Sequence, residues 1–487
     1  MRKPILALFS LVFCVTSLSW ADLPTQLWEA RYNSPSNSAD VPSALAVDGL
    51  GNVYVTGKSI IGSYYDYATI KYDSNGDELW KSLYDGPANE SDYSEALTID
   101  DLGNVYVAGV SDGGQTLNDC VTIKYDSNGN ELWVASFDGL NSKSDGLEDL
   151  VVDSFGNVYV TGYSLSYGVS MDYVTIKYDP NGNELWVSRY NGPDNAQDWP
   201  KAIDIDNTGN TYVTGWSGGI GTDYDYATIK YAPDGNELWV ARYDKLANRD
   251  EATDLIVDDY GNVYVTGYSS ANATVGGNRF TTIKYDTNGI QQWLNNSFIG
   301  SAGDYDGVSI AVDTLGYVYI AGSSNSAGYE IAKINPYGNT QWTAIYDEPT
   351  GYDYATDLVV DDFGNVYVTG YSQGNGTQRD YATVMYDSLG NEQWVTRYDG
   401  PPNDNDYAVG LALDNSGNLY VTGWSNGWSN GPTGYDYTTI KYSLYEYCTG
   451  PIEGDLNNDC KIDFIDLSTL IGNWLKCNLV NQDDCVP

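Results

Sequence analysis

Short stretches of alternating apolar and polar residues recur along the chain, each flanked by glycines. The clearest is Gly51-Asn-Val-Tyr-Val-Thr-Gly57. Seven related stretches follow at steps of 48 to 55 residues, beginning at Gly103, Gly156, Gly209, Gly261, Gly316, Gly364 and Gly417. Alternation with a period of two is typical of a β-strand with one buried face. Self-similarity at this spacing indicates a repeat architecture of eight units.

The residues around each copy predict four strands per unit. In the first unit we expect strands over 44–48, 52–56, 66–72 and 78–84, with a tight turn at Asp73-Ser-Asn-Gly76. The repeats show no helical pattern. Four antiparallel strands repeated about one axis predict a β-propeller. We expect the short apolar first strand to be innermost and the Trp-containing fourth strand, the longest, to form the outer edge.

The two ends of the repeat region predict how the ring closes. The region begins with a Trp strand near Trp28 and ends with a third strand near Ile440. Pairing these ends removes the exposed edges of an open array. We therefore expect an all-β, eight-bladed propeller over residues 22–443 with one-plus-three closure. An open solenoid would need polar capping units, and a seven-bladed ring would have to omit the weakest copy, at Gly316.

Each repeat also carries a long signature. It reads Asp-x-x-Gly-Asn-Val-Tyr-Val-Thr-Gly, then Asp-Tyr-Ala-Thr-Ile-Lys-Tyr-Asp-x-Asn-Gly-Asn-Glu-Leu-Trp. This signature resembles the SBBP family of bacterial β-propeller repeats over about residues 27–443. The resemblance implies a secreted or surface propeller without a shared active site. The family is named for seven blades, and the eight copies here depart from that number.

A second resemblance concerns the Trp strand. The spacing Asp73, Gly76, Trp80 is similar to the tryptophan-docking motif of eight-bladed quinoprotein dehydrogenases. That resemblance implies that each Trp packs between two blades. It does not extend to the enzyme, because the chain has neither an adjacent cysteine pair for the quinone nor a Cys-x-x-Cys-His haem site.

Charge and composition exclude several classes of function. The formal net charge is −44, which opposes nucleic-acid binding because that requires Lys and Arg against phosphates. The chain has no histidine, so Ser-His-Asp and Cys-His catalysis and His-ligated zinc are excluded in their usual forms.

The N-terminus reads as a signal peptide over residues 1–21. Arg2 and Lys3 precede an apolar run over 5–15, and Ser19-Trp20-Ala21 offers a cleavage site. The run is too short to span a bilayer. We expect a secreted or cell-surface protein without a membrane span.

Acidic and aromatic residues are the candidate binding groups of the propeller. Seven copies place an Asp eight residues before the Asp that ends the first strand, as in Asp40 and Asp48, and the third strand usually opens with an acid, as in Asp66 or Glu330. An acidic rim could bind calcium or cationic partners, but turn capping explains a residue present in every blade better. Four aromatic residues break the symmetry on the same face and are our candidates for ligand binding: Trp199, Trp216, Trp424 and Trp428.

The repeat pattern stops after Tyr442, and residues 444–487 form a separate module. Its calcium loop has oxygen ligands at EF-hand spacing, from Asp455, Asn457, Asp459, the Lys461 carbonyl, Asp463 and Asp466. A helix is expected over 467–475. The loop resembles half of a type I dockerin, which implies a cohesin-like partner. Cys460 at position 6, Asp466 at position 12 and the absence of a second full loop depart from that family.

The cysteines support an exported module. Four lie close together, at Cys448, Cys460, Cys477 and Cys485, and predict two disulfides with three possible connectivities. Cys120 stands alone in a third strand and is expected to be a buried free thiol.

These features predict a secreted, non-catalytic binding or scaffold protein. The propeller face would recognise a glycan or an extracellular protein, and the C-terminal module would dock or anchor with calcium. The alternative is a carbohydrate-active enzyme, a hydrolase or lyase that uses carboxylates in the central channel. The sequence leaves the ligand and the oligomeric state open.

Overall fold

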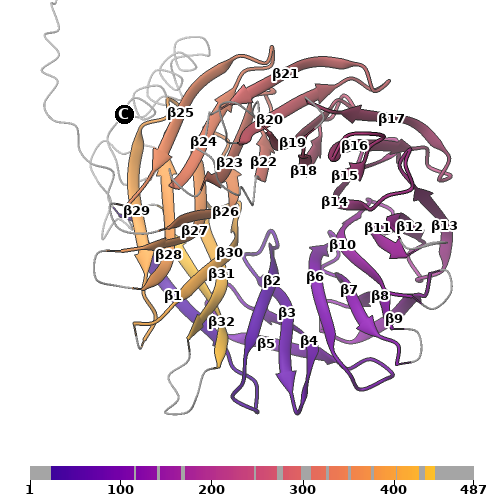
Figure 1. Cartoon of the computed structure of the whole chain (residues 1–487). Coiled ribbons are helices and arrows are strands. Elements are labelled where there is room, and N and C mark those ends of the chain that lie inside the picture. Colours follow the sequence, from indigo (N-terminus) through magenta and orange to yellow (C-terminus); the bar gives the residue numbers. More distant parts are fainter. Residues whose placement is uncertain are drawn as a thin grey trace, which may run out of the picture.

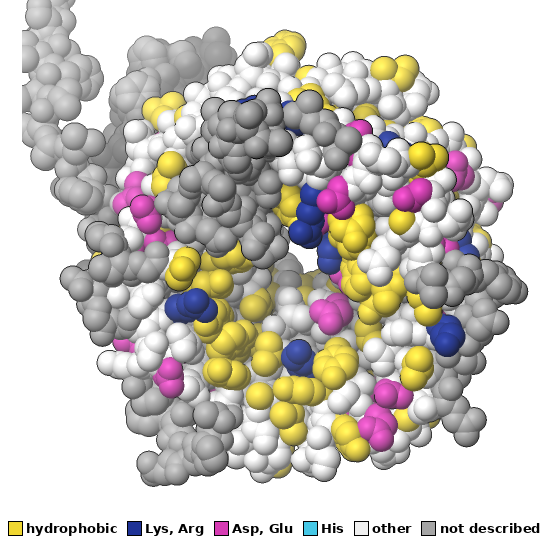
Figure 2. Space-filling model, viewed as in Figure 1, with side chains coloured by type: hydrophobic (Ala, Val, Ile, Leu, Met, Phe, Trp, Pro, Cys, Tyr) yellow, Lys and Arg dark blue, Asp and Glu magenta, His cyan; other side chains and the backbone are white. Residues whose placement is uncertain are grey.

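The chain forms a ring of eight four-stranded antiparallel sheets around a central opening (Figure 1). The computed structural model describes residues 23–114, 117–139, 143–165, 170–245, 248–270, 278–297, 309–324, 328–348, 352–374, 378–401, 403–426 and 434–444. The predicted eight-bladed, all-β propeller is confirmed within these ranges. Figure 2 shows the opening, with hydrophobic side chains and a few Lys and Arg side chains around its rim.

Each blade contributes one strand to each of four positions. The inner strands are β2 Asp40–Val47, β6 Asp92–Ile99, β10 Asp145–Val152, β14 Asp198–Ile205, β18 Asp250–Val257, β22 Ser309–Val312, β26 Asp353–Val360 and β30 Asp406–Leu413. The second strands are β3 Val53–Ile61, β7 Val105–Asp112, β11 Val158–Leu165, β15 Thr211–Gly218, β19 Val263–Ser270, β23 Val318–Ser324, β27 Val366–Gln373 and β31 Asn418–Asn426. The third strands are β4 Tyr64–Tyr72, β8 Asn118–Tyr125, β12 Met171–Tyr178, β16 Tyr224–Tyr231, β20 Asn278–Tyr285, β24 Gly328–Ile334, β28 Arg379–Tyr386 and β32 Tyr435–Ser443. The outer strands are β5 Glu78–Tyr84, β9 Glu131–Phe137, β13 Glu184–Tyr190, β17 Glu237–Tyr243, β21 Gln291–Ser297, β25 Thr340–Tyr346, β29 Glu392–Tyr398 and β1 Thr25–Tyr32. We number the blades 1 to 8 by their inner strands in chain order.

The ring closes in blade 8 as expected. The N-terminal strand β1 pairs antiparallel with β32, from Thr25 opposite Ser443 to Tyr32 opposite Tyr437. The sheet order is β1-β32-β31-β30, so blade 8 contains one strand from the beginning of the chain and three from its end. One-plus-three closure is therefore confirmed.

The expected strand lengths were wrong at two positions. The inner strand of blade 1 starts at Asp40 and not at residue 44. The sequence pattern missed residues 40–43, because a β-bulge at Ser43 interrupts the alternation of apolar and polar residues. The outer Trp strands are not the longest. Those of blades 1 to 7 have seven residues, whereas β2 has eight and β3 has nine.

The aspartate that ends each inner strand holds the turn to the second strand. In blade 1, Asp48 Oδ1 accepts hydrogen bonds from the backbone N–H groups of Leu50 and Asn52, each at 2.9 Å. Its Oδ2 accepts from Asn52 Nδ2 at 2.7 Å and from the Tyr54 hydroxyl at 3.1 Å. Gly51 has φ of +76°, a left-handed conformation that favours glycine. Burial opposes ionisation of Asp48, but these hydrogen bonds, led by those from Asn52, lower its pKa below its ordinary value.

The outer tryptophans join neighbouring blades. Each indole N–H donates to a backbone carbonyl in the turn between the third and outer strands of the next blade, at 3.0–3.2 Å. The pairs are Trp28–Ser74, Trp80–Ser127, Trp133–Pro180, Trp186–Pro233, Trp239–Thr287, Trp293–Pro336 and Trp342–Ser388. The packing that the docking motif implied is therefore present at these seven junctions.

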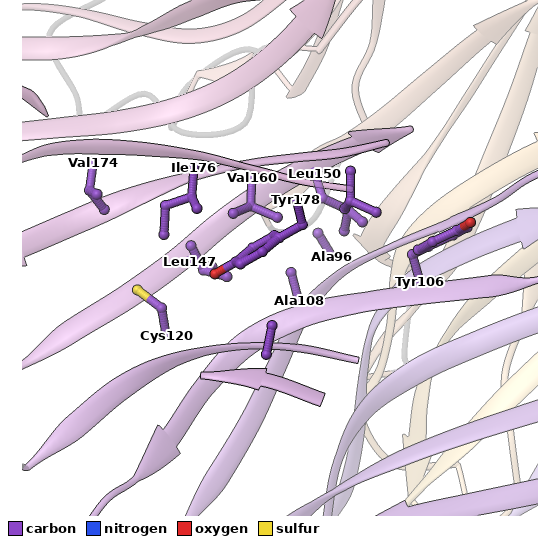
Figure 3. Packing of buried hydrophobic residues seen from close by; sticks show 12 residues of the cluster. Ala96, Tyr106, Ala108, Cys120, Leu147, Leu150, Val160, Val174, Ile176 and Tyr178 are labelled. Atoms are coloured by element: carbon purple, nitrogen blue, oxygen red, sulfur yellow. The ribbon is translucent and has the colours of Figure 1, made fainter. Parts of the chain in front are cut away.

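Apolar side chains fill the space between blades. At the junction of blades 2 and 3, Leu147, Val160 and Tyr178 pack against Ala108 (Figure 3). Cys120 belongs to this cluster and is a fully buried free thiol, as expected. Burial raises its pKa well above the ordinary value, so the thiol stays protonated and unreactive.

One predicted acid lies elsewhere in blade 6. Glu330 pairs with Gly322, so it occupies the position of Ala68 in blade 1 and does not open its strand. Gly328, two residues earlier, holds the expected position of the acid, because it pairs with Ser324 as Asp66 pairs with Ser59. No helix among the described residues is long and apolar enough to cross a bilayer.

Candidate functional site

Two of the candidate tryptophans form one aromatic stack in blade 4. Trp199 on β14 and Trp216 on β15 are cross-strand partners, and their rings stack with centroids 6.1 Å apart and planes 17° apart. Tyr163 of blade 3 lies 4.1 Å from Trp199, and Tyr224 lies 4.2 Å from Trp216. All four rings are half-buried. We call these four residues the first aromatic stack.

A second aromatic stack lies four blades further around the ring. Its members are Tyr371, Tyr407, Trp424 and Tyr435, and all are half-buried. Tyr407 and Trp424 stack at 4.0 Å with a 26° interplanar angle. Tyr371 approaches Tyr407 at 4.6 Å, and Tyr435 approaches Trp424 at 4.2 Å. Eight blades form the ring, so the two stacks face each other across the opening.

Strand direction puts both stacks on the same face. Inner and third strands begin there, and second strands end there, so we call it the stack face. The opposite face carries the turns closed by Asp48 and its equivalents, and we call it the turn face. Side chains at strand ends are held by the sheets and still reach solvent, which suits a binding surface.

Charged residues stand beside the first stack on the inner strands. A bulge in each of three neighbouring blades leaves one extra residue, Glu95, Glu148 and Lys201. Lys201 Nζ lies 2.9 Å from Glu148 and 5.4 Å from the Trp199 ring centroid. Burial, followed by the neighbouring Glu148, raises the pKa of Glu95 to about 7. The sequence did not single out these three residues, because their equivalents in blades 1 and 5 are Ser43 and Thr253.

The second stack has its own cation. Arg379 Nη1 donates to the Tyr407 hydroxyl at 2.6 Å. The guanidinium carbon lies 5.4 Å from the Tyr371 ring centroid and 5.5 Å from that of Tyr407. Cation–π contacts at this distance hold the rings in place.

Further along the inner strands, carboxylates tie blade to blade. Asp149 Oδ2 accepts from Ile203 N of the next blade at 2.9 Å, and Asp254 Oδ2 accepts from Ile310 N at 3.0 Å. Burial raises the pKa of Asp254 to about 8, and the carboxylates of Asp149 and Asp357 add to this effect. These aspartates are structural links between blades.

The repeated acids that we expected to be structural divide into two groups. Asp40 caps a turn, as Ser34 N donates to its Oδ2 at 2.7 Å and Ser59 Oγ donates to its Oδ1 at 2.6 Å. Three of the acids near the start of third strands pair with arginines instead: Asp225 with Arg242 at 2.8 Å, Asp380 with Arg397 at 2.9 Å and Asp436 with Arg31 at 3.7 Å. The arginines of the outer strands were missed in the sequence, although they recur three residues after the Trp, as Arg31, Arg189, Arg242 and Arg397.

The turn face has shallow cavities between blades. One of about 380 Å³ lies between the Asp100 and Asp153 turns and is lined by Leu102, Lys124 and Phe155. Leu102 and Phe155 are each 81% exposed at the turn tips. These cavities recur with the repeat and therefore do not distinguish one blade from another.

Several predicted site residues lie outside the described residues. They are the signal peptide, Trp428, the calcium-loop residues Asp455, Asn457, Asp459, Lys461, Asp463 and Asp466, and the cysteines Cys448, Cys460, Cys477 and Cys485. The calcium loop, its dockerin-like role and the two disulfides stay predictions.

Solved structures of low sequence identity share the fold. The quinohemoprotein alcohol dehydrogenase of Comamonas testosteroni matches with a TM-score of 0.53 and 13% identity, over 89% of this chain and 78% of that one. Sqt1 of Chaetomium thermophilum matches with a TM-score of 0.53 and 10% identity, over 86% and 99%. At these identities the likeness concerns the fold alone.

Comparison by sequence gives two further findings. An uncharacterized WD repeat-containing protein of Acanthamoeba polyphaga mimivirus is 28% identical over 231 residues, which are 44% of this chain and only 15% of the viral protein. The SBBP beta-propeller repeat matches eight times, at residues 34–65, 86–114, 139–168, 188–222, 246–272, 298–330, 341–376 and 393–432. These matches together cover more than half of the chain, and the protein therefore belongs to the SBBP family of beta-propeller repeat proteins.

Proposed function

We propose that the protein is an exported, non-catalytic binding protein whose stack face holds a polysaccharide. The observation that carries this proposal is the pair of aromatic stacks, each of which contains a second-strand Trp, Trp216 or Trp424, that the other six blades lack. Half-buried Trp and Tyr rings offer flat apolar surfaces with fixed orientation. Such surfaces suit the apolar faces of sugar rings, and the hydroxyl groups of a sugar can bond to nearby charged side chains such as Lys201 and Glu148.

Charge favours an uncharged or cationic glycan. The chain carries −44 overall, so a polyanionic polysaccharide or a nucleic acid would be repelled at long range. Lys201 is paired with Glu148, and Arg379 bonds to Tyr407. The charge of Lys201 is therefore balanced by the Glu148 carboxylate. We therefore favour neutral glycans as the first class to test.

The test is binding of the full mature chain to a panel of insoluble and soluble polysaccharides. Trp216→Ala and Trp424→Ala each remove one stack, and Phe363→Ala, 66% exposed on the turn face, is the matched control. We expect each Trp variant to lose retention while the control keeps it. Equal retention of all three variants would place binding elsewhere, and capture of a protein without any glycan would favour the protein-binding alternative.

A second candidate function rests on Glu95. It is a carboxyl with a pKa raised to about 7, next to the carboxylate Glu148 in the neighbouring blade, and such a pair suits general acid–base catalysis. A carbohydrate-active hydrolase or lyase would lose turnover in Glu95→Gln and keep substrate binding. A binding protein would show no turnover in either form.

The C-terminal module, 444–487, is proposed to dock the propeller to an extracellular partner with calcium. Support comes from the ligand spacing of its loop and its resemblance to half a dockerin. Deleting 448–487 should abolish calcium-dependent capture of a cohesin-like protein from envelope extract, while binding of polysaccharide to the propeller persists. Capture that survives the deletion, or that ignores a chelator, would contradict this role.

A further inference from the structure

Three groups of carboxylates lie at junctions between blades on the stack face. Each combines the Asp that opens a third strand, the Asp after the outer strand and the Asp that opens the inner strand of the next blade. The groups are Asp66, Asp85 and Asp92; Asp119, Asp138 and Asp145; and Asp380, Asp399 and Asp406. Within each, one oxygen from every residue lies within 4.8 Å of the others.

In blades 4, 7 and 8 an arginine of the outer strand pairs with the Asp near the start of the third strand. Arg242 bonds to the Tyr190 hydroxyl of the preceding blade at 2.8 Å, to Ser217 Oγ at 2.6 Å and to Asp225 at 2.8 Å. We call this arrangement the arginine clamp. Arg397 makes the same set of contacts with Tyr346, Ser372 and Asp380. Arg31 repeats it with Tyr398 and Ser425 and lies 3.7 Å from Asp436.

Of the three carboxylate groups, the one at Asp380 has such an arginine, and the one at Asp119 has a guanidinium near Asp145. Asp380 is 2.9 Å from Arg397 Nη2. Burial raises the pKa of Asp145, and the nearby Arg189 guanidinium opposes that rise.

The group at Asp66 has no arginine. The clamp position of blade 1 is Leu83, which pairs with Ala68 as Arg242 pairs with Ala227. The clamp position of blade 2, which would serve Asp92, is Ser136. Asp66 is 6% exposed, and its carboxylate has neither a hydrogen bond nor an ion pair to the described residues. Burial, with Asp85 and Asp92, raises its pKa to about 6.

We propose that Asp66, Asp85 and Asp92 bind a calcium ion. Oxygens within 4.8 Å of one another can all contact one ion, because Ca²⁺ binds oxygen at about 2.3–2.6 Å. Asp85 is exposed, so an ion can enter from solvent and keep water ligands. Blades 4, 7 and 8 fill this position with a guanidinium. At the Asp66 group two of the three carboxylates are almost fully buried without one.

The ion would join two blades as the arginine clamp does. Asp66 and Asp85 belong to blade 1, and Asp92 opens the inner strand of blade 2. Asp92 Oδ2 already accepts from Gly86 N at 2.7 Å, which fixes its carboxylate at the junction. This site is separate from the C-terminal loop and does not depend on the proposed glycan binding.

Leu83→Arg gives the sharpest test, because it introduces the guanidinium that blades 4, 7 and 8 have at this position and removes no ligand. The full mature chain is titrated with calcium by calorimetry in an Asp455→Ala/Asp463→Ala background, which silences the C-terminal loop. We expect one calcium equivalent to disappear in Leu83→Arg and in Asp66→Asn. Asp380→Asn, in a group that has its arginine, should keep the parent stoichiometry.

The same titration can overturn the proposal. It fails if the background chain binds no calcium, or if Leu83→Arg and Asp66→Asn bind as much calcium as the background chain. Circular dichroism of each variant establishes folding. If Asp66→Asn does not fold, Leu83→Arg decides alone, since it retains all three carboxylates.

Discussion

The Trp80 indole donates its N–H to the Ser127 carbonyl of the next blade at 3.1 Å, and its ring lies on Gly129. A Cβ on Gly129 would stand 2.5 Å from Trp80 Cδ2, and φ there is +81°. Two reasons therefore require a glycine in the Asp-x-x-Gly turn: the backbone has a positive φ, and a side chain would collide with the Trp ring of the neighbouring blade. This relationship recurs around the ring and holds the blades in register.

Gly129→Ala should destabilise the propeller by roughly 2 kcal/mol or more, since a strained backbone and a displaced ring both cost free energy. Chemical denaturation measures the free energy of unfolding. The control is Gly62→Ala, where φ is +80° and no atom lies within 4 Å of the added Cβ. A loss no larger than that of Gly62→Ala would show that the contact with Trp80 contributes nothing.

Arg242→Leu places in blade 4 the residue type that blade 1 has at this position, Leu83. It should lower the free energy of unfolding by roughly 2 kcal/mol. The change leaves Asp225 buried without its partner, and the cost is below that of a fully buried pair because Arg242 is partly exposed. Arg242→Leu/Asp225→Asn should recover part of the loss. Lys81→Leu, which breaks an exposed pair with Glu78, should change stability by less than about 0.5 kcal/mol. An Arg242→Leu effect as small as this would contradict the clamp.

Stability should fall as pH rises through the near-neutral range. An unfolded aspartate has a pKa of about 3.9, whereas burial raises that of Asp254 to about 8. Between these values the folded chain binds more protons than the unfolded chain, so the free energy of unfolding decreases with pH. Asp48, with its lowered pKa, acts in the opposite direction below about pH 4. Stability is therefore greatest in mildly acid solution.

Denaturation midpoints from pH 5 to pH 8 check this dependence. The midpoint of Asp254→Asn should decline less steeply with pH than that of the parent. The control is Asp101→Asn, at an exposed position of the turn face, and its midpoint should decline in parallel with that of the parent. A midpoint that rises over this interval, or an equal slope in Asp254→Asn, would show that Asp254 does not carry the effect.

The blades and their closure could be predicted from the sequence because each repeat supplies its own turns and strand pattern. Trp28 and Ile440 revealed the closure, since both belong to one four-stranded unit. The bulges could not be predicted, because the extra residue at Glu95 or Lys201 breaks the alternation on which strand recognition depends.

The candidate site also contains residues that the sequence could identify and residues that it could not. Trp199, Trp216 and Trp424 stood out because other repeats have different residues there. Tyr163 did not stand out, because it packs on Trp199 from the preceding blade, and contacts between blades depend on the rotation from one blade to the next. The carboxylate group at Asp66 became distinctive only when Leu83 could be placed in register with Arg242.

The central claim is that the two aromatic stacks hold a glycan, and its most direct test is the dissociation constant of the polysaccharide retained best by the parent chain. Trp216→Ala/Trp424→Ala is compared with each single variant and with Phe363→Ala. We predict that the double variant binds at least about tenfold more weakly, which is about 1.4 kcal/mol, while Phe363→Ala binds as the parent does. A double variant with the parent's dissociation constant, or a parent that retains no polysaccharide, would contradict the account.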